Sequence, residues 1–421
     1  MTSSPGDARI MRPDELSPSI TYDRMAPMTK FRQAKLLRIA SRATFGACVG
    51  FLVLGMWAAT VSAVDHVLFR HDESQRELSG RVLTELSEGG LLFQSDDGAT
   101  WAIDPDQVIE RRQDEAEFTP LSADEVGRRV LAELPPGFQI HKTNHYVICY
   151  DTSRVFAQWA GALFERLYMA FTNYWQRKGF EVIEPEFPLV AVLFADRQAY
   201  IKFAEPELGG AAPAVAGYYS IRTNRITTFD LTGLETLRQP GDRRATAAQI
   251  NAMLARPQAE RTVATIVHEA THQIAFNCGL QTRYSDIPLW VSEGIAVYFE
   301  TPDLSSRSGW RNIGGVNWHR FEGFRRYVPK RGSDSLAALV TSDDKLRDPQ
   351  TAGDAYSEAW ALVYFLIRQR PEEFHEYMRL LSAKPRLGRD EPGQRLEEFT
   401  RIFGPLDELD AEFLRYMSKV R

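Results

Sequence analysis

Residues 261–276 read RTVATIVHEATHQIAF and contain the pattern His-Glu-x-x-His at positions 268–272. Residues four apart on a helix lie one above the other on the same face, so the imidazoles of His268 and His272 can reach one tetrahedral Zn²⁺ ion. Glu269 follows the first histidine, where its carboxylate can act as general base on the water that the metal binds. Apolar residues surround the motif, and buried histidines need polar partners or a metal. The stretch therefore predicts a metal-binding helix.

A third ligand has to come from another part of the chain. In the metzincin pattern a Gly and a His would follow, but Ala275 and Cys278 occupy those positions. The next predicted helix, residues 289–300, reads LWVSEGIAVYFE. A carboxylate in this apolar segment is costly unless it is paired or bound to metal, so Glu293 is the predicted third ligand and water takes the fourth position. Glu300 is the competing candidate for this role. We expect it either to hydrogen-bond one of the metal ligands without binding the metal itself or to form a surface salt bridge.

The two motifs together resemble those of the gluzincin metallopeptidases, whose second motif, Trp-x-x-Glu-Gly-x-Ala-x-Tyr, matches residues 290–298. A closer resemblance, to peptidase-MA-like proteins of uncharacterised function, extends over about residues 134–421. The resemblance implies a zincin-like domain that hydrolyses peptide bonds with Zn²⁺. It also implies an edge strand that holds an extended peptide and a Tyr or His that stabilises the oxyanion. The candidates are Gly217, Tyr218 and Tyr219 for the strand and Tyr356 for the oxyanion. The tyrosines are open to a plainer interpretation, as strand aromatics and a helix cap.

The hydrophobic pattern predicts an α+β fold for residues 119–421, with a mixed sheet followed by a helical half. A small β-module of three or four strands is predicted within residues 65–118, where turn signals separate short β-type runs. The predicted segments of the larger domain are a helix at 122–134, strands at 145–150 and 189–194, helices at 154–178 and 197–204, a hairpin at 216–230, and helices from 246 to the end with interruptions at 302–315 and 330–348.

The amino-terminal part differs in charge from the rest of the 421-residue chain, which is 44% hydrophobic and has a net charge of −6. Residues 1–64 have a net charge of +4 and the remainder −10, so no overall basic surface is available for nucleic acid. Residues 43–64 carry no charge and follow a basic tail, residues 1–42, which predicts an export segment. A cleaved signal peptide and a retained membrane anchor both remain open. Either one predicts an extracytoplasmic protein, on the periplasmic face or secreted.

Four further residues complete the sequence-based expectations. Cys149 and Cys278 are expected to form either a disulfide, which an exported compartment permits, or two buried thiols. His319 and His375 are expected to be surface residues and not ligands.

The sequence thus predicts a zinc peptidase that acts on a peptide or protein substrate. A non-catalytic exported binding domain braced by zinc is the alternative, and a membrane-anchored scaffold without metal is the third. Glu269 argues against the zinc-braced domain, because a structural zinc site needs no base and would close its fourth position with a protein ligand. Metal analysis of the purified protein would decide the third.

Overall fold

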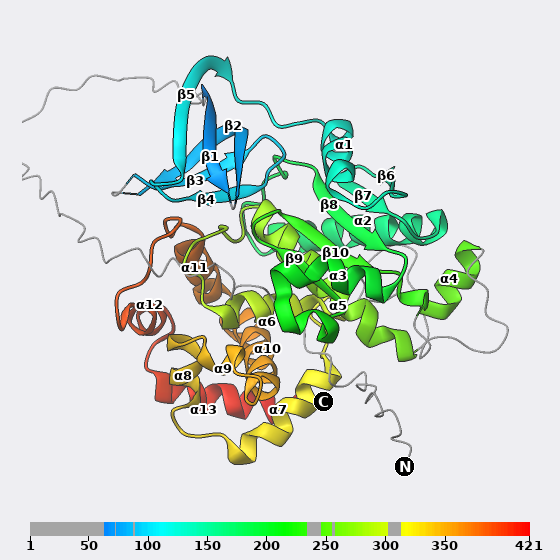
Figure 1. Cartoon of the computed structure of the whole chain (residues 1–421). Coiled ribbons are helices and arrows are strands. Elements are labelled where there is room, and N and C mark those ends of the chain that lie inside the picture. The colour runs from blue at the N-terminus through cyan, green and yellow to red at the C-terminus, as the bar shows by residue number, and fades with distance from the viewer. Residues whose placement is uncertain (1–62, 72, 87–88, 234–245, 255–256, 302–312) are drawn as a thin grey trace, which may run out of the picture. The chain divides into compact units, whose positions relative to one another are not determined.

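A computed structural model describes residues 63–71, 73–86, 89–233, 246–254, 257–301 and 313–421 (Figure 1). The described chain divides into two compact units, one that ends at Pro120 and one that begins at Leu121. The predicted basic tail lies outside the described residues. So does the predicted membrane segment, except for Ala63 and Val64, which begin the first strand. Within the described ranges, no helix is both long and apolar enough to cross a membrane.

The first unit is a five-stranded antiparallel sheet with the strand order β4-β3-β2-β1-β5. Its small core consists of Val67, Phe69, Leu91, Phe93 and Ile103. The sequence predicted three or four strands. It missed β1, which begins with the last two residues of the predicted membrane segment. It also missed β5, which is mostly charged and exposed and has no alternating apolar pattern. The strands are β1 (Ala63–His71), β2 (Ser74–Glu85), β3 (Leu91–Ser95), β4 (Thr100–Ile103) and β5 (Val108–Glu117).

The second unit contains a mixed five-stranded sheet with the order β6-β7-β8-β10-β9. β7, β8 and β10 run parallel, and β6 and β9 pair antiparallel at the two edges. β7 and β8 are wholly buried, as continuous apolar runs are when both faces of a sheet are covered. Asn224, with φ of 59°, closes the predicted hairpin. The strands are β6 (Gln139–Lys142), β7 (Tyr146–Tyr150), β8 (Leu189–Phe194), β9 (Gly217–Ser220) and β10 (Arg225–Phe229).

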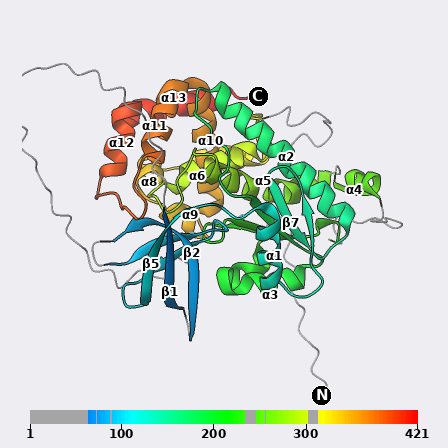
Figure 2. The ribbon, with the colours of Figure 1, turned by 90° about the horizontal axis from the view of Figure 1, so that it is seen from above.

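Helices cover both faces of this sheet (Figure 2). On one face, Tyr219 stacks on Phe276 of α5 with ring centroids 5.9 Å apart, and α2 packs beside α5. On the other face, Tyr218 meets Tyr200 of α3 at 6.3 Å, and α1 packs on β7. The α+β prediction is confirmed. These helices are α1 (Ala123–Glu133), α2 (Arg154–Arg177), α3 (Arg197–Leu208) and α5 (Pro257–Asn277).

The carboxyl-terminal half is helical and is organised around α10, which contacts α6, α7, α9, α11 and α13. Residues 330–348, predicted as an interruption, contain the two short helices α8 and α9. Helices of seven and four residues are too short to show a period in the sequence. The remaining helices are α4 (Ala247–Leu254), α6 (Leu289–Phe299), α7 (Trp318–Tyr327), α8 (Ser335–Thr341), α9 (Asp344–Arg347), α10 (Ala352–Gln369), α11 (Pro371–Ser382), α12 (Gln394–Phe403) and α13 (Leu406–Met417).

Cys149 on β7 and Cys278 at the end of α5 are free thiols, and both are buried. The second of the two cysteine alternatives therefore holds in the structure. Burial raises the pKa of each thiol to about 12, so neither is a reactive thiolate at neutral pH.

Candidate metal centre

Two packed helices, α5 and α6, bring together the three residues that the sequence predicted as metal ligands. His268 and His272 lie one turn apart on α5, with ring centroids 4.7 Å apart. Glu293 comes from the middle of α6, which follows Pro288 and whose first main-chain N–H, that of Leu289, donates to a side-chain oxygen outside the helix. All eleven residues of α6 are buried, so the carboxylate of Glu293 cannot turn toward water.

The three side chains converge at distances that suit a metal ion. His268 Nε2 lies 3.1 Å from His272 Nε2 and 3.1 Å from Glu293 Oε2, and the third separation is 3.9 Å. Ligands about 2.1 Å from a tetrahedral Zn²⁺ ion are about 3.4 Å apart, and the observed distances bracket this value. The side chains are at most 1% exposed. The buried group His268, His272 and Glu293 can hold a metal ion.

Hydrogen bonds from outside the group orient both imidazoles. His268 Nδ1 lies 2.7 Å from Glu300 Oε1, and His272 Nδ1 lies 3.4 Å from Ser292 Oγ. With the proton on each Nδ1, the two Nε2 lone pairs point toward each other and toward the carboxylate of Glu293. A bound cation would offset the electrostatic repulsion among these three acceptors. Of the two roles expected for Glu300, the structure shows the hydrogen bond to a histidine and not the surface salt bridge, since the Glu300 side chain is only 9% exposed.

The electrostatics of the group favour positive charge. Burial disfavours the charged imidazole of His268, but hydrogen bonds to Glu293 and Glu300 outweigh burial and raise its pKa to about 10. Burial, and then the neighbouring His268, lower the pKa of His272 well below its ordinary value. The two carboxylates therefore stabilise a cation at this position, and only one of the two imidazoles takes up a proton.

Glu269, the predicted base, lies between the metal group and the sheet. Its Oε2 accepts the main-chain N–H of Tyr219 across 2.8 Å. Its Oε1 is buried and has no hydrogen-bond partner among the described residues. Burial raises the pKa of this carboxyl to about 8. A buried carboxyl with one open oxygen and a pKa near neutrality can both accept and return a proton.

Tyr356 reaches the metal group from α10. Its hydroxyl hydrogen-bonds the carboxylate of Glu293, and its ring is buried. Gly294 allows the necessary approach of α6 and α10, because a Cβ there would lie 2.5 Å from a side-chain carbon of Val363. Burial raises the pKa of the Tyr356 hydroxyl well above its ordinary value, so this group remains a proton donor. The structure thus brings Tyr356 next to Glu293, although the two residues are far apart in the sequence.

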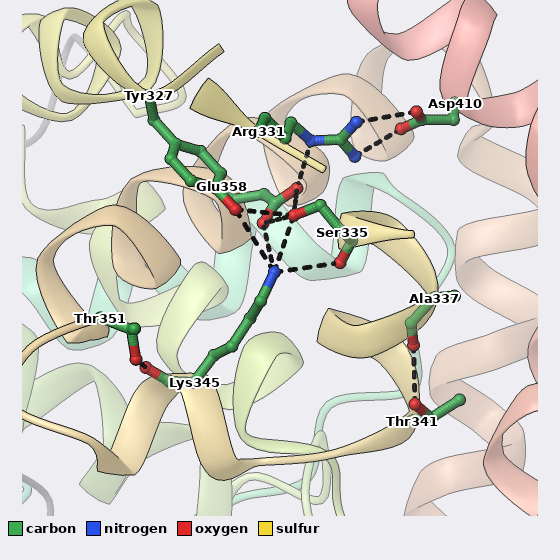
Figure 3. Close-up of polar contacts among 9 residues, drawn as sticks. All are labelled: Tyr327, Arg331, Ser335, Ala337, Thr341, Lys345, Thr351, Glu358 and Asp410. Atoms are coloured by element: carbon green, nitrogen blue, oxygen red, sulfur yellow. Dashed lines mark hydrogen bonds and ion pairs between the residues drawn. The ribbon is translucent and has the colours of Figure 1, made fainter. Parts of the chain in front are cut away.

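On another side of α10, a buried ionic cluster holds the helix in place (Figure 3). Glu358 is fully buried and accepts from Arg331 Nε at 2.6 Å and from Ser335 Oγ at 2.9 Å. Arg331 also donates to both carboxylate oxygens of Asp410, and Lys345 Nζ lies 3.8 Å from Glu358. The two cations and two carboxylates compensate one another, so the cluster anchors α10 to its neighbours without an unpaired charge.

The three residues predicted to bind substrate lie on β9, at the edge of the sheet. Tyr219 meets Glu269 through its main chain, and its hydroxyl donates to Asn224 at 2.8 Å. The side chain of Tyr218 points to the opposite face of the sheet. Gly217 packs closely on Thr228, since a Cβ added at Gly217 would lie 3.1 Å from the Cβ of Thr228. These side chains are strand packing groups, and it is the main chain of β9 that meets the predicted base.

Sequence reasoning missed two residues of α7 that contact this centre. Asn317, the N-cap of α7, donates to Glu300 across 3.3 Å, and Arg320 lies over the ring of Tyr356. An Asn before an amphipathic helix signals a cap, but nothing in the local pattern indicates which carboxylate it meets. Two of the remaining histidines were expected on the surface. His319 is exposed on α7, as expected, and His375 is half-buried against Phe180.

Comparison with known families found a match within the second unit. Residues 262–388 match a family described as a protein of unknown function, DUF1570. The matched segment is less than a third of the chain, and it contains His268, His272 and Glu293 together with Glu269 and Tyr356. No curated protein matches the chain. The similarity therefore covers the metal centre and names no activity.

Proposed function

We propose that the chain is a zinc-dependent peptidase whose catalytic domain, residues 119–421, is zincin-like. The observation that carries the proposal is the open oxygen of Glu269. Oε1 is buried without a partner among the described residues, and Glu269 adjoins a ligand of the metal group. An unpaired buried carboxylate oxygen is costly, and a structural zinc site has no use for it. A base that receives a proton during turnover accounts for it.

The donor set suits zinc in a hydrolytic site. His268, His272 and Glu293 supply two imidazoles and one carboxylate, the set that leaves a fourth position open in zinc hydrolases. A bound Zn²⁺ ion would lower the pKa of a water molecule and polarise the substrate carbonyl. Glu300 and Ser292 contact Nδ1 of the two imidazoles and would keep each Nε2 directed toward a bound ion.

Proton transfer is the task of Glu269. Because Oε2 of Glu269 accepts the N–H of Tyr219, Oε1 is the atom that takes the proton from the water. The oxygen of this water attacks the peptide carbonyl. The same carboxyl then gives this proton to the leaving nitrogen, the C–N bond breaks, and a carboxylic acid and an amine are released. The hydroxyl of Tyr356 is assigned to the developing oxyanion, and the main chain of Gly217, Tyr218 and Tyr219 to an extended peptide substrate.

A non-catalytic binding domain braced by zinc is the second candidate. It is favoured by burial, because the ligand side chains are at most 1% exposed and all four residues of β9 are buried. A peptide could reach such a site only if part of the structure moved. Both candidate functions include export directed by residues 1–64, and this part of the proposal rests on the charge pattern of the sequence.

The test uses the full chain loaded with zinc, a peptide library, and mass spectrometry of the products with and without a chelator. We expect Glu269→Gln to keep the zinc content of the wild type and to lose cleavage by about 100-fold or more. Glu322→Gln, at an exposed carboxylate of α7, is the control and should change neither quantity. An unchanged rate in Glu269→Gln would refute the peptidase assignment. Zinc binding without any cleavage would favour the second candidate, and no zinc binding would refute both.

A further inference from the structure

Arg320 on α7 is a guanidinium at the metal centre that no step of the proposed hydrolysis uses. Its side chain is 12% exposed, and its Nη2 lies 4.0 Å from Glu300 Oε1. Its Cζ lies 5.4 Å from the ring centroid of Tyr356. The position is set by close packing of α7 on α10, since a Cβ at Gly323 would lie 2.5 Å from Ser357 Oγ.

The hydrogen-bonding capacity of this guanidinium is largely unused. Nε is buried and has no hydrogen-bond partner among the described residues. The 4.0 Å to Glu300 is an ion-pair distance that is too long for a hydrogen bond. Glu300 uses its oxygens for His268 and Asn317, at 2.7 and 3.3 Å. Buried polar groups are nearly always hydrogen-bonded, so an Arg in this state needs an acceptor from outside the described chain.

The geometry points to a carboxylate as that acceptor. A guanidinium that lies over an aromatic ring keeps the N–H groups in its own plane available, and these form paired hydrogen bonds to the two oxygens of a carboxylate. Arg320 is one contact from two residues that themselves bind ligands of the metal group. It lies beside Glu300, which bonds His268, and over Tyr356, which bonds Glu293. An acceptor held by Arg320 would therefore lie near the metal group.

We propose that Arg320 binds the C-terminal carboxylate of a peptide substrate and so directs cleavage to the last peptide bond. The inference rests on the proposed peptidase function and specifies its substrate class. Consecutive Cα atoms are about 3.8 Å apart, so the terminal carboxylate of the last residue lies one residue from the scissile carbonyl. The carboxylate of an acidic side chain, or of a C-terminus several residues beyond the scissile bond, would lie at a different distance from that bond. Arg320 is thus a residue that determines specificity.

The first experiment compares pairs of peptides that differ only in a free or an amidated C-terminus. With the zinc-loaded full chain, we expect kcat/KM to be about 10- to 100-fold higher for the free acid, the range of one charge-assisted interaction. Arg320→Met should abolish this preference, and Arg320→Lys should keep part of it. Arg325→Met, at an exposed Arg of the same helix, is the matched control and should retain it. The wild-type comparison does not depend on whether a variant folds.

The second experiment separates this inference from the proposed function. Binding of a short acetylated peptide, as free acid and as amide, is measured by calorimetry with the Glu269→Gln chain. Tighter binding of the acid, lost when Arg320→Met is added, supports the carboxylate site even if no peptide is cleaved by the wild type. Equal binding and equal cleavage of acid and amide would overturn it. A loss in Arg320→Met that is the same for both peptides would also overturn it, because Arg320 would then only position Glu300 and Tyr356.

Discussion

Glu300 Oε1 lies 2.7 Å from His268 Nδ1, although 32 residues separate the two in the chain. When His268 Nδ1 donates its proton to Glu300, Nε2 of the neutral imidazole is available as a metal ligand. Asn317 holds the other oxygen of Glu300 at 3.3 Å. The imidazole therefore cannot rotate without breaking a buried, charge-assisted hydrogen bond.

Loss of this carboxylate should weaken metal binding. Glu300→Gln keeps the shape of the side chain but removes the charge that supports His268, so we expect the affinity for Zn²⁺ to fall by about 10- to 100-fold. Competition with a chromogenic chelator measures the change. Glu322→Gln, on the exposed side of α7, is the control. An affinity equal to that of the wild type would show that Glu300 does not support His268.

The stability of the metal-free chain should depend on the ionisation of Glu269. Burial raises the pKa of this carboxyl from 4.5 to about 8 in the folded chain. Its contribution to stability is therefore complete below pH 4.5 and is lost as the pH rises to 8. In excess chelator, we expect the Tm of the wild type to fall more steeply than that of Glu269→Gln between about pH 5 and about pH 8, the window between the unfolded and folded pKa values. Parallel curves would mean that Glu269 titrates alike in both states.

The close contact of α6 and α10 should not tolerate a methyl group. In Gly294→Ala the new Cβ would lie 2.5 Å from Val363 Cγ2 and 2.8 Å from the carbonyl oxygen of Ala359. We expect a loss of about 1–3 kcal/mol in the free energy of unfolding, together with weaker zinc binding, because Glu293 is the preceding residue. Gly353→Ala, on α10 with open space around it, should be neutral or stabilising in the same denaturant titration.

The ionic cluster of Figure 3 should contribute to stability and not to metal binding. Arg331→Met removes the partner of Asp410 and leaves the fully buried Glu358 with only Lys345 nearby. We expect it to lower the free energy of unfolding by about 3 kcal/mol or more. Arg370→Met removes a half-exposed ion pair and should cost about 1 kcal/mol at most. Equal losses, measured by denaturant unfolding, would contradict the importance of burial.

Much of the larger unit could be predicted from local patterns. The buried strands β7 and β8, the metal helix and the hairpin before it follow from apolar periodicity and turn residues, which act over a few neighbouring positions. Elements without such a signal were missed. β5 is mostly charged and exposed, and α8 and α9 are too short to show a period. Their formation depends on pairing or packing with segments far away in the chain.

The sequence by itself determined that His268 and His272 share one face of a helix with Glu269 beside them, because the turn of a helix is a local property. The tertiary structure alone decided which distant groups meet them. Whether Glu300 supported a histidine or lay on the surface depended on the packing of α6 against α5. The packing of α7 and α10 likewise brought Arg320 over Tyr356, a contact between residues 36 positions apart that no local pattern encodes.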